Sequence, residues 1–517
     1  MKKILTSIAA GLMISAQVLA VSVKDVCGQF NGDLNIGGTP YPNKSVYLLP
    51  GVVDNTVTFV LPDFMFNAGK LGNIVLPNIP MSANGQLTLE NATLYLDSIS
   101  ERATITVVNG LEDGGQVYNS IVTASEAQVI LSIAAPSLVE PIYVLFAGQA
   151  VKTQNYVLPN SGFEGEWTNN EPEGWHSFGS ACGLFVDFIK ENTFQFVQSD
   201  VVRPGSAGSH SALISSNIVM GVKANGNCTN GQVNAGSMTA TDSLGNYNFS
   251  DPDSAFVTPF HGRPDSIVFW AKYQPADLNP SNEVNQARLN AVITTNARYQ
   301  DPESNASHAA CKIGAATLNY SANADMSWQR LAVPFAYEAN KAGQAPAYIL
   351  ATFSTNKLPG GGSSYTTGGT FAKQNILDSV YIDDVEIIYN HALSEFKKGQ
   401  NVLPFVKGVA TDADNYCDDC AKFAATSEGI TAQAFIAYDA VHKCIFIYVI
   451  ADDYAQSGAY NLYRVEFADS DTSDLNPKEA IEFVHNEKAS FEKVIINGRL
   501  FIRSNDAMYD ILGKRIK

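Results

Sequence analysis

The sequence predicts an all-β protein of several domains, and three observations support this fold class. Short apolar runs alternate with turn residues along most of the chain, and their dominant period is two. At 517 residues, the chain is longer than one hydrophobic core usually serves. Only 16% of the residues are charged, whereas Asn, Ser, Thr, Gly and Tyr are abundant. This composition is typical of β-rich extracellular domains with polar loops.

The first twenty residues indicate export. Lys2 and Lys3 precede an apolar run from Ile4 to Leu19, and the segment ends in Val18-Leu19-Ala20. We interpret residues 1–20 as a cleavable signal peptide. The run is shorter than the ~20 residues that a spanning helix needs, and no later segment comes close, so we expect no membrane-spanning segment. The expected location is periplasmic, cell-surface or extracellular, with outer-membrane or cell-surface proteins as partners.

The net charge restricts the class of ligand. The whole chain carries a formal charge of −18, and loss of the signal peptide makes it more negative. Nucleic acids and anionic membrane surfaces would therefore be repelled on average, and we expect no nucleic-acid partner. Neutral sugars carry no such penalty.

The cysteines do not form a disulfide scaffold. There are seven of them, an odd number, spread from Cys27 to Cys444. Cys417 and Cys420 have the spacing of a redox or zinc motif, but no second such pair follows. We interpret them as a local disulfide or as two ordinary thiols.

Residues 28–150 predict a small closed barrel. They contain about seven to nine short alternating strands and no helix-length amphipathic segment. The segments Phe59–Phe64 and Gly72–Pro80 resemble the calycin-like β-barrel domains of exported Bacteroidota proteins. The resemblance implies either an apolar pocket of the lipocalin kind or a barrel that its own side chains fill. We favour the filled barrel.

Residues 155–392 carry a different set of motifs. The segment opens with Asn160–Glu164, has Gly174-Trp175 soon after, continues with a Gly208–Ile214 strand and closes with Tyr381–Val385. Together with the Trp328–Phe335 strand, these motifs resemble a β-jelly roll of the carbohydrate-binding type. Within that class the segment Gly262–Tyr273 resembles the putative carbohydrate metabolism domain of Bacteroidota. A carbohydrate ligand is what the resemblance implies.

The remaining residues predict two further β elements. Leu393 to Gly399 is mostly polar and is interpreted as a linker. Residues 400–470 contain strands similar to bacterial immunoglobulin-like repeats, with an acidic turn at Asp452-Asp453. Residues 490–517 form a hairpin pattern with an Asn497-Gly498 turn and resemble the C-terminal sorting signals of type IX secretion. The alternative is a plain terminal hairpin.

The closing strand of the jelly roll contains a break in its alternation. Val380 and Ile382 share one phase, whereas Val385 and Ile387 share the other, which a one-residue bulge at Asp383-Asp384 would explain. The resemblance implies that the opening and closing strands are neighbours, which would bring Glu164 near Asp383 or Asp384. It thereby implies a structural Ca²⁺ site, because Ca²⁺ takes oxygen ligands. The alternative is a pair of solvated turn acids.

Catalytic residues are not expected. Glu164 and Glu166 are weak candidates, because a period of two puts both on one strand face, about 6.5 to 7 Å apart. The chain has no nucleophile elbow, no His-Glu-x-x-His helix and no phosphate-binding Gly-Lys loop. If the protein is an enzyme, we expect a glycoside hydrolase.

Sugar binding by a jelly roll needs aromatic rings beside polar groups. Trp270 lies in a very apolar run and Trp328 opens a strand with core-like partners, so we interpret both as core residues. Trp167, Tyr247 and Tyr365 lie in polar surroundings and are the candidate ligand-binding rings.

The sequence therefore predicts an exported modular protein whose jelly roll binds or scaffolds carbohydrate without catalysis. The barrel and the immunoglobulin-like part are expected to be spacers. Two alternatives stay open, namely a glycoside hydrolase that uses jelly-roll carboxylates and a lipocalin-like carrier of an apolar ligand.

Overall fold

The computed structural model describes residues 20–510, with several gaps. The gaps are residues 67–68, 97–100, 114, 137, 153, 191–195, 220–221, 240, 276–285, 358–377, 407, 418–422, 474, 476–481, 484–490, 497–498 and 505–506. The signal peptide, Tyr365, Cys420, the Asn497-Gly498 turn and the last seven residues of the sorting-like segment lie outside the described residues. Strands dominate the described chain, which confirms the all-β prediction. The chain divides into two compact units between Glu482 and Phe483.

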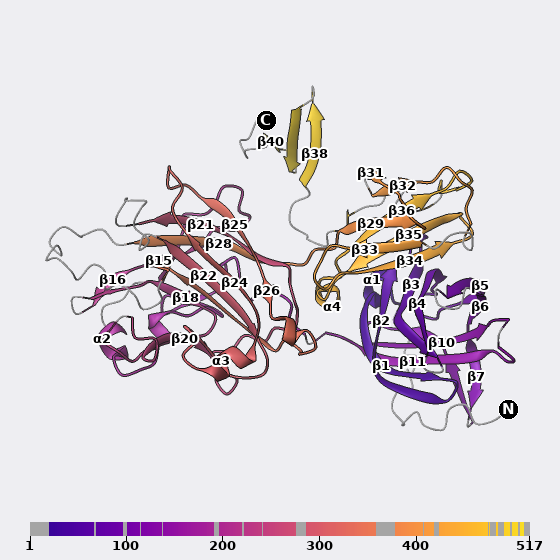
Figure 1. The fold of residues 1–517 in the computed structure, drawn as a ribbon, viewed down its shortest axis with the longest axis horizontal. Coiled ribbons are helices and arrows are strands. Elements are labelled where there is room, and N and C mark those ends of the chain that lie inside the picture. The colour runs from indigo at the N-terminus through magenta and orange to yellow at the C-terminus, as the bar shows by residue number, and fades with distance from the viewer. Residues whose placement is uncertain are drawn as a thin grey trace. The chain divides into compact units, whose positions relative to one another are not determined.

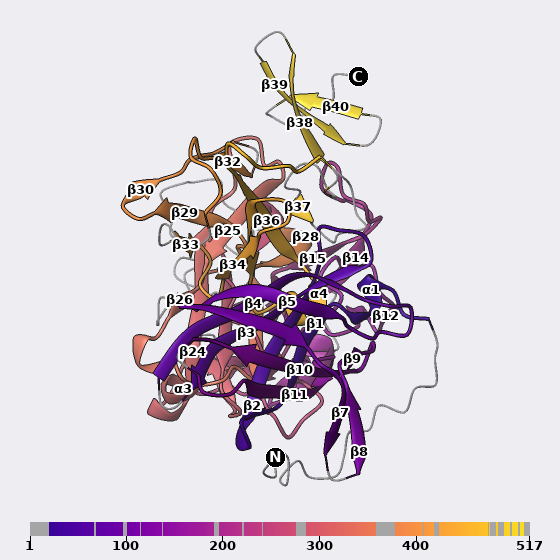
Figure 2. The same cartoon turned by 90° about the vertical axis from the view of Figure 1, so that its right-hand side faces the viewer.

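The N-terminal strands form a nearly closed barrel (Figure 2). Its strands follow one another around the wall in the order β4-β3-β2-β1-β11-β10-β6-β5. The elements are α1 (Val23–Val26), β1 (Gly28–Ile36), β2 (Thr39–Pro50), β3 (Thr56–Phe66), β4 (Gly69–Pro80), β5 (Leu89–Leu96), β6 (Glu101–Val107), β9 (Ile121–Val122), β10 (Glu126–Ala134) and β11 (Ile142–Ala150). A separate hairpin of β7 (Asn109–Asp113) and β8 (Gln116–Asn119) extends from the wall.

Buried hydrophobic side chains from all eight strands of the barrel wall occupy its interior. Phe30, Phe59 and Phe146 are among the largest, and each is 1% exposed. Because alternate residues of each strand point inward, one continuous core results. This packing agrees with the expectation of a barrel that is filled by its own side chains.

The middle of the chain forms a two-sheet sandwich (Figure 1). The first sheet has the order β14-β15-β28-β21-β25, and the second has the order β18-β27-β22-β24-β26. The first comprises β14 (Phe196–Ser199), β15 (Ser211–Ser215), β28 (Ser379–Ile388), β21 (Ser266–Gln274) and β25 (Gln329–Pro334). The second comprises β18 (Asn227–Thr229), β27 (Tyr348–Ser354), β22 (Ala287–Thr294), β24 (Lys312–Tyr320) and β26 (Ala336–Tyr337). Their facing side chains, Trp175 and Phe269 among them, form one core.

Smaller elements surround the sandwich. A third sheet contains β19 (Gln232–Ala235), β20 (Asn246–Ser250) and β23 (Tyr299–Asp301). Two hairpins consist of β12 (Trp167–Thr168) with β13 (Glu171–Pro172), and of β16 (Asn217–Val219) with β17 (Val222–Ala224). The helical segments are η1 (Phe178–Ser180), α2 (Val186–Lys190), α3 (Ala306–Cys311) and η2 (Ala339–Lys341).

The β-sheet part that follows the jelly roll begins earlier in the sequence than expected. The predicted linker forms strand β29 (Leu393–Lys398), whose Phe396 is fully buried and stacks on Phe423. The linker interpretation was wrong, because the apolar residues Leu393 and Phe396 suffice to anchor the central strand of the sheet β30-β29-β33 among charged residues. The other elements are β30 (Asn401–Val402), β31 (Phe405–Val406), β32 (Val409–Thr411), β33 (Phe423–Ser427), β34 (Gln433–Asp439), β35 (Cys444–Ile450), α4 (Tyr454–Ser457), β36 (Tyr460–Glu466) and β37 (Glu482–Phe483).

One face of the sheet that contains β34, β35 and β36 packs on the outside of the barrel. Leu49, Val60 and Val75 of the barrel share a core with Phe446 and Tyr448. The barrel and the C-terminal sheet are therefore not separate spacers, since each covers apolar surface of the other.

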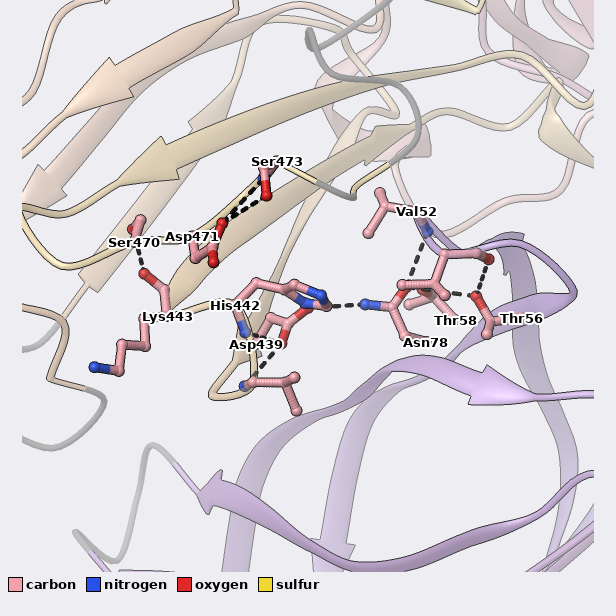
Figure 3. A network of polar contacts seen from close by, with 12 residues as sticks. Val52, Thr56, Thr58, Asn78, Asp439, His442, Lys443, Ser470, Asp471 and Ser473 are labelled. Carbon is pink, nitrogen blue, oxygen red and sulfur yellow. Dashed lines mark hydrogen bonds and ion pairs between the residues drawn. The ribbon is translucent and has the colours of Figure 1, made fainter.

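Polar contacts cross the same interface (Figure 3). The amide of Asn78 accepts a hydrogen bond from the Val52 N–H at 2.9 Å and donates one to Asp439 at 2.9 Å. The Asp439 carboxylate is also 2.8 Å from Nδ1 of His442. Asp439 is only 5% exposed, so these partners satisfy a buried charge.

Hydrogen bonds to aspartate side chains also join the jelly roll to the C-terminal sheet. The Asp265 carboxylate accepts hydrogen bonds from the N–H groups of Asn390 and Ile430, at 2.7 and 2.8 Å. The Arg263 N–H donates to Asp452 at 3.1 Å, and His391 contacts Asp453 at 2.8 Å. The acidic turn predicted at Asp452-Asp453 is thus a junction that leads into α4.

The second compact unit is a three-stranded antiparallel sheet. Its strands are β38 (Phe491–Ile496), β39 (Arg499–Ser504) and β40 (Ala507–Asp510). The pairing of Ile496 with Arg499 agrees with the predicted hairpin. The sorting-signal assignment stays a prediction.

Most of the described cysteines are not cross-linked. Cys417 is disulfide-bonded, and the five other described cysteines carry free thiols. Burial raises the pKa of the Cys27 and Cys444 thiols, which lowers their reactivity at neutral pH. No helix in the described residues is long and apolar enough to cross a membrane.

The interface between the barrel and the C-terminal sheet predicts a measurable coupling. The Tyr454 hydroxyl donates a hydrogen bond to the Leu48 carbonyl at 2.6 Å, and Tyr454 is 2% exposed. Tyr454→Phe should lower the free energy of unfolding by about 1–2 kcal/mol in urea titrations, because a buried carbonyl loses its partner. Tyr41→Phe is the control, since no hydrogen bond of its hydroxyl is found among the described residues. Equal effects of the two substitutions would contradict the coupling.

Candidate functional site

The candidate site lies on the outer face of the five-stranded sheet β14-β15-β28-β21-β25. In β21, the side chains of Ile267, Phe269, Ala271 and Tyr273 point inward and are fully buried in the sandwich core. Alternation therefore directs Trp270 and Lys272 outward, where both are partly exposed. The prediction that Trp270 is a core residue was wrong, because only the phase of Ile267 and Phe269 faces the sandwich core, whereas Trp270 shares the outward phase with polar residues and with Val268.

A β-bulge in β28 shapes the same face. The pairing register of β28 with β21 shifts between Val268 and Trp270, and Asp384 has a positive φ of 43°. This confirms the predicted bulge at Asp383-Asp384. Val380 and Ile382 before it and Val385 after it all point into the core. As a result, Asp383 and Glu386 both lie on the outer face, opposite Trp270 and Val268.

Three aromatic rings gather on this face. Tyr381 pairs with Lys272 across the strands, and Trp270 lies between Asp383 on one side and Arg330 on the other. The ring centroids of Trp328 and Tyr381 are 6.2 Å apart, and Nζ of Lys272 is 5.4 Å from the Tyr381 centroid. Trp328 is partly exposed and belongs to none of the buried clusters, so its interpretation as a core residue was also wrong.

Residues 200–210 form a loop that covers one end of the face, with Arg203 as its anchor. The guanidinium of Arg203 contacts Asp384 through Nε and Nη2, both at 2.6 Å, and lies 5.0 Å from the Trp270 centroid. Its backbone N–H donates to Asp383 at 3.0 Å. One side chain thus ties the loop to the bulge and to the aromatic face.

Asp383 is held in an unusual environment. Its side chain is fully buried, and one of its carboxylate oxygens has no hydrogen-bond partner. Burial, with a smaller contribution from the Asp384 carboxylate, raises the pKa of Asp383 to about 6, although the Arg203 N–H opposes this shift. The same two causes raise the pKa of Glu386, which its neighbours partly desolvate.

Glu164 contacts the other end of the loop. Its carboxylate accepts hydrogen bonds from the N–H and hydroxyl groups of Ser209, at 3.1 and 3.2 Å, and from the His210 N–H at 2.9 Å. Partial desolvation raises its pKa, but these hydrogen bonds outweigh that effect and the net shift is downward. A side chain at Gly208 would collide with Glu164, since a Cβ there would lie 2.0 Å from Oε1.

The predicted neighbours in the sandwich do meet, and Glu164 lies near Asp384 as expected, since a Cβ at Gly162 would be 3.6 Å from Oδ1 of Asp384 and 3.8 Å from Cγ of Glu164. The Val385 N–H donates to the Ser161 carbonyl at 2.9 Å, so the opening and closing segments lie side by side as expected. Glu164 is hydrogen-bonded to Ser209 and His210, whereas Asp384 contacts the Arg203 guanidinium, so each carboxylate has its own partners. These acids do not present a shared set of oxygens, and the described residues contain no group of three or more His, Cys, Asp or Glu suited to a metal ion. Calcium binding stays a prediction.

The candidate rings from the sequence lie elsewhere. Trp167 donates from Nε1 to the Phe163 carbonyl at 3.0 Å and packs on Phe196, so it closes the edge of the core. Tyr247 lies on β20 beneath Arg298, whose guanidinium carbon is 5.7 Å from its centroid. Glu166 is exposed on the β12-β13 hairpin.

A signal for the outer face was present in the sequence. Ser266, Lys272 and Gln274 share the phase of Trp270 in β21, and Arg330 of β25 has the same phase as Trp328, which directly precedes that strand. These polar neighbours indicate a solvent-facing phase for both tryptophans.

The anchoring contacts of Arg203 predict an effect on stability. Arg203→Met should lower the free energy of unfolding by about 1–3 kcal/mol at pH 7, because two acids lose their cationic partner. Limited proteolysis should also cleave residues 200–210 faster. Arg298→Met is the matched control, since its 3.4 Å contact with Asp251 is more exposed and is expected to contribute about 0–1 kcal/mol. A loss no larger than that of the control would argue against the anchor.

The raised pKa of Asp383 predicts a pH dependence. The folded protein binds this proton more tightly than the unfolded chain, whose Asp pKa is about 3.9, so the stabilisation is present below that value and is lost as pH rises through about 6. Asp452, whose pKa burial also raises to about 6, contributes in the same direction. Calorimetric Tm values between pH 4 and 7 should therefore fall less for Asp383→Asn than for the wild type. Parallel curves would refute the assignment.

No protein family model matches this chain, and no curated protein matches it either. Two solved structures from Bacteroides are similar to parts of it. A putative glycoside hydrolase from Bacteroides thetaiotaomicron has 13% identity and a TM-score of 0.31, and the match covers 68% of this chain and 99% of that chain. A putative outer membrane protein from Bacteroides fragilis has 16% identity and a TM-score of 0.18, and the match covers 25% of this chain and 52% of that chain.

Proposed function

We propose that the jelly roll binds a glycan on the outer face of its five-stranded sheet and performs no chemistry on it. The observation that carries this proposal is the clustering of Trp270, Trp328 and Tyr381, all partly exposed, on neighbouring strands. A pyranose presents apolar C–H groups that stack on aromatic rings, and its hydroxyls need polar partners beside those rings. Lys272 and Arg330 stand at the adjoining positions.

The rigidity of the platform supports binding. All three rings are attached at or next to strands whose opposite faces pack on the sandwich core, so little side-chain and backbone freedom is lost when a ligand binds. Arg203 restricts Trp270 further by lying over its ring. Such preorganisation favours recognition of a fixed sugar shape.

Glycoside hydrolysis is the alternative that one observation favours. Asp383 and Glu386 lie on the same face, and both have raised pKa values, as a general acid requires. Asp383 is fully buried beneath the Arg203 loop, however, and Glu164 is engaged by its loop partners with a lowered pKa. A second carboxylate that reaches a bound sugar is therefore missing from the described part of this face, which favours binding without hydrolysis.

The remaining parts are proposed to support an exported protein. The filled barrel interior favours a scaffold over a carrier of apolar ligands. The C-terminal three-stranded unit is proposed as the sorting element, and other cell-surface proteins are proposed as partners.

Substitution of the platform rings tests the proposal. Trp328→Ala and Tyr381→Ala should each weaken glycan binding about tenfold or more, because a stacking surface is lost without disturbing the core. Isothermal titration calorimetry on the full chain, with the soluble glycan that gives the strongest signal on a glycan array, measures this change. Glu386→Gln should leave binding intact, and the wild type should release no reducing sugar.

Tyr247→Ala is the matched control, since Tyr247 lies on the separate β19-β20-β23 sheet. Loss of binding in this control, with unchanged affinity in the two platform variants, would move the site to β20. Release of reducing sugar that Glu386→Gln abolishes would replace the proposal with the hydrolase.

A further inference from the structure

Two cations on the outer face form no ion pair with a carboxylate of the described residues. Lys272 contacts the Tyr381 ring, and no carboxylate lies within ion-pair distance of it among the described residues. Arg330 is exposed and likewise forms no ion pair there. By contrast, Arg203, Arg288 and Lys398 each contact a carboxylate at 2.6 to 2.8 Å.

The setting of these two cations is informative because acids dominate the chain. It contains 51 Asp and Glu residues against 33 Lys and Arg residues. Arg330 acts on Glu386 of the same face and opposes the rise in the pKa of that carboxyl, but neither cation is held in an ion pair, so both side chains can contact a ligand. Arg203 does not share this property, because Asp384 neutralises it.

Register places the two cations beside the same rings. Arg330 pairs with Trp270 across β21 and β25, and Lys272 lies two residues further along β21 on the same face. Diagonal positions of this kind are about 7–8 Å apart at Cα, so both long side chains reach one anionic group above the platform. The ring of a single sugar can then stack on Trp328 or Tyr381 while its charged substituent meets both cations.

We infer that the platform is specific for anionic saccharides, which carry a uronic carboxylate or a sulfate ester. This inference rests on the proposed function of the same face and adds the chemical class of its ligand. The guanidinium supplies paired donors to a carboxylate or a sulfate, and the ammonium adds a point charge. The overall negative charge of the protein makes selection depend on these local contacts, because the long-range field repels anionic polymers.

Two matched pairs of soluble polymers test the inference. Polygalacturonate and its fully methyl-esterified form differ in the carboxylate, and dextran sulfate and dextran differ in the sulfate. Calorimetry on the full chain should show at least tenfold tighter binding to the charged member of one pair. The pair that responds identifies the anionic group.

Charge variants separate specific from non-specific attraction. Lys272→Gln and Arg330→Gln should each weaken the charged polymer about tenfold and leave the neutral member unchanged. Lys44→Gln removes a lysine on barrel strand β2 and should have no effect. Equal weakening by Lys44→Gln would overturn the inference, because it would indicate diffuse electrostatic attraction.

The two proposals fail differently in this experiment. Equal binding of neutral and charged polymers that Trp328→Ala abolishes would retain the glycan platform and reject its preference for anions. Binding of none of the four polymers, nor of any glycan on the array, would reject both.

Discussion

The bulge at Asp383-Asp384 is the constraint on which the arrangement of the jelly-roll face depends. An uninterrupted β28 could not keep both Ile382 and Val385 in the core, because alternation would turn one of them to solvent. The extra residue keeps both inside and leaves Asp384 in a left-handed conformation beside Arg203. Arg203 then joins the loop, the bulge and the Trp270 ring.

Burial of Asp383 is the cost of this arrangement. An unpaired carboxylate oxygen in the interior disfavours the ionised form, which raises the pKa of Asp383 towards neutrality. The Arg203 N–H and guanidinium offset part of that cost. Asp383, Asp384 and Arg203 therefore position the loop and the Trp270 ring, while the buried carboxyl lowers stability at neutral pH.

The C-terminal sheet packs its apolar face on the outside of the barrel, so the two parts share one hydrophobic core. One face of β35 contributes Phe446 and Tyr448 to the core with the barrel, whereas Ile445 and Ile447 on the other phase pack towards β29. A strand whose seven residues are all buried needs cover on both faces. The barrel supplies one of these covers, which explains why a chain of separate-looking modules is joined by long-range contacts.

Prediction of the site from sequence succeeded where a local pattern carried the information. The bulge followed from the phase change between Ile382 and Val385, and the meeting of the opening and closing segments followed from the resemblance to jelly rolls. The apolar run around Trp270 and the core-like strand partners of Trp328 wrongly indicated that both rings are in the core. Their polar neighbours in the same phase were the better guide, since exposure in a strand is a property of the phase and not of one residue.

The sequence by itself determined the all-β class, the barrel, the strands of the C-terminal sheet and the bulge, because each depends on alternation over a few neighbouring residues. Only the tertiary structure decided that Arg203 neutralises Asp384, that Glu164 binds the loop at Ser209, and that the rings of Trp270 in β21, Tyr381 in β28 and Trp328 just before β25 share one face. These contacts join residues up to 181 positions apart. Local periodicity specifies which side of a strand a residue occupies, but the strand order of the sheet decides which residues become its neighbours.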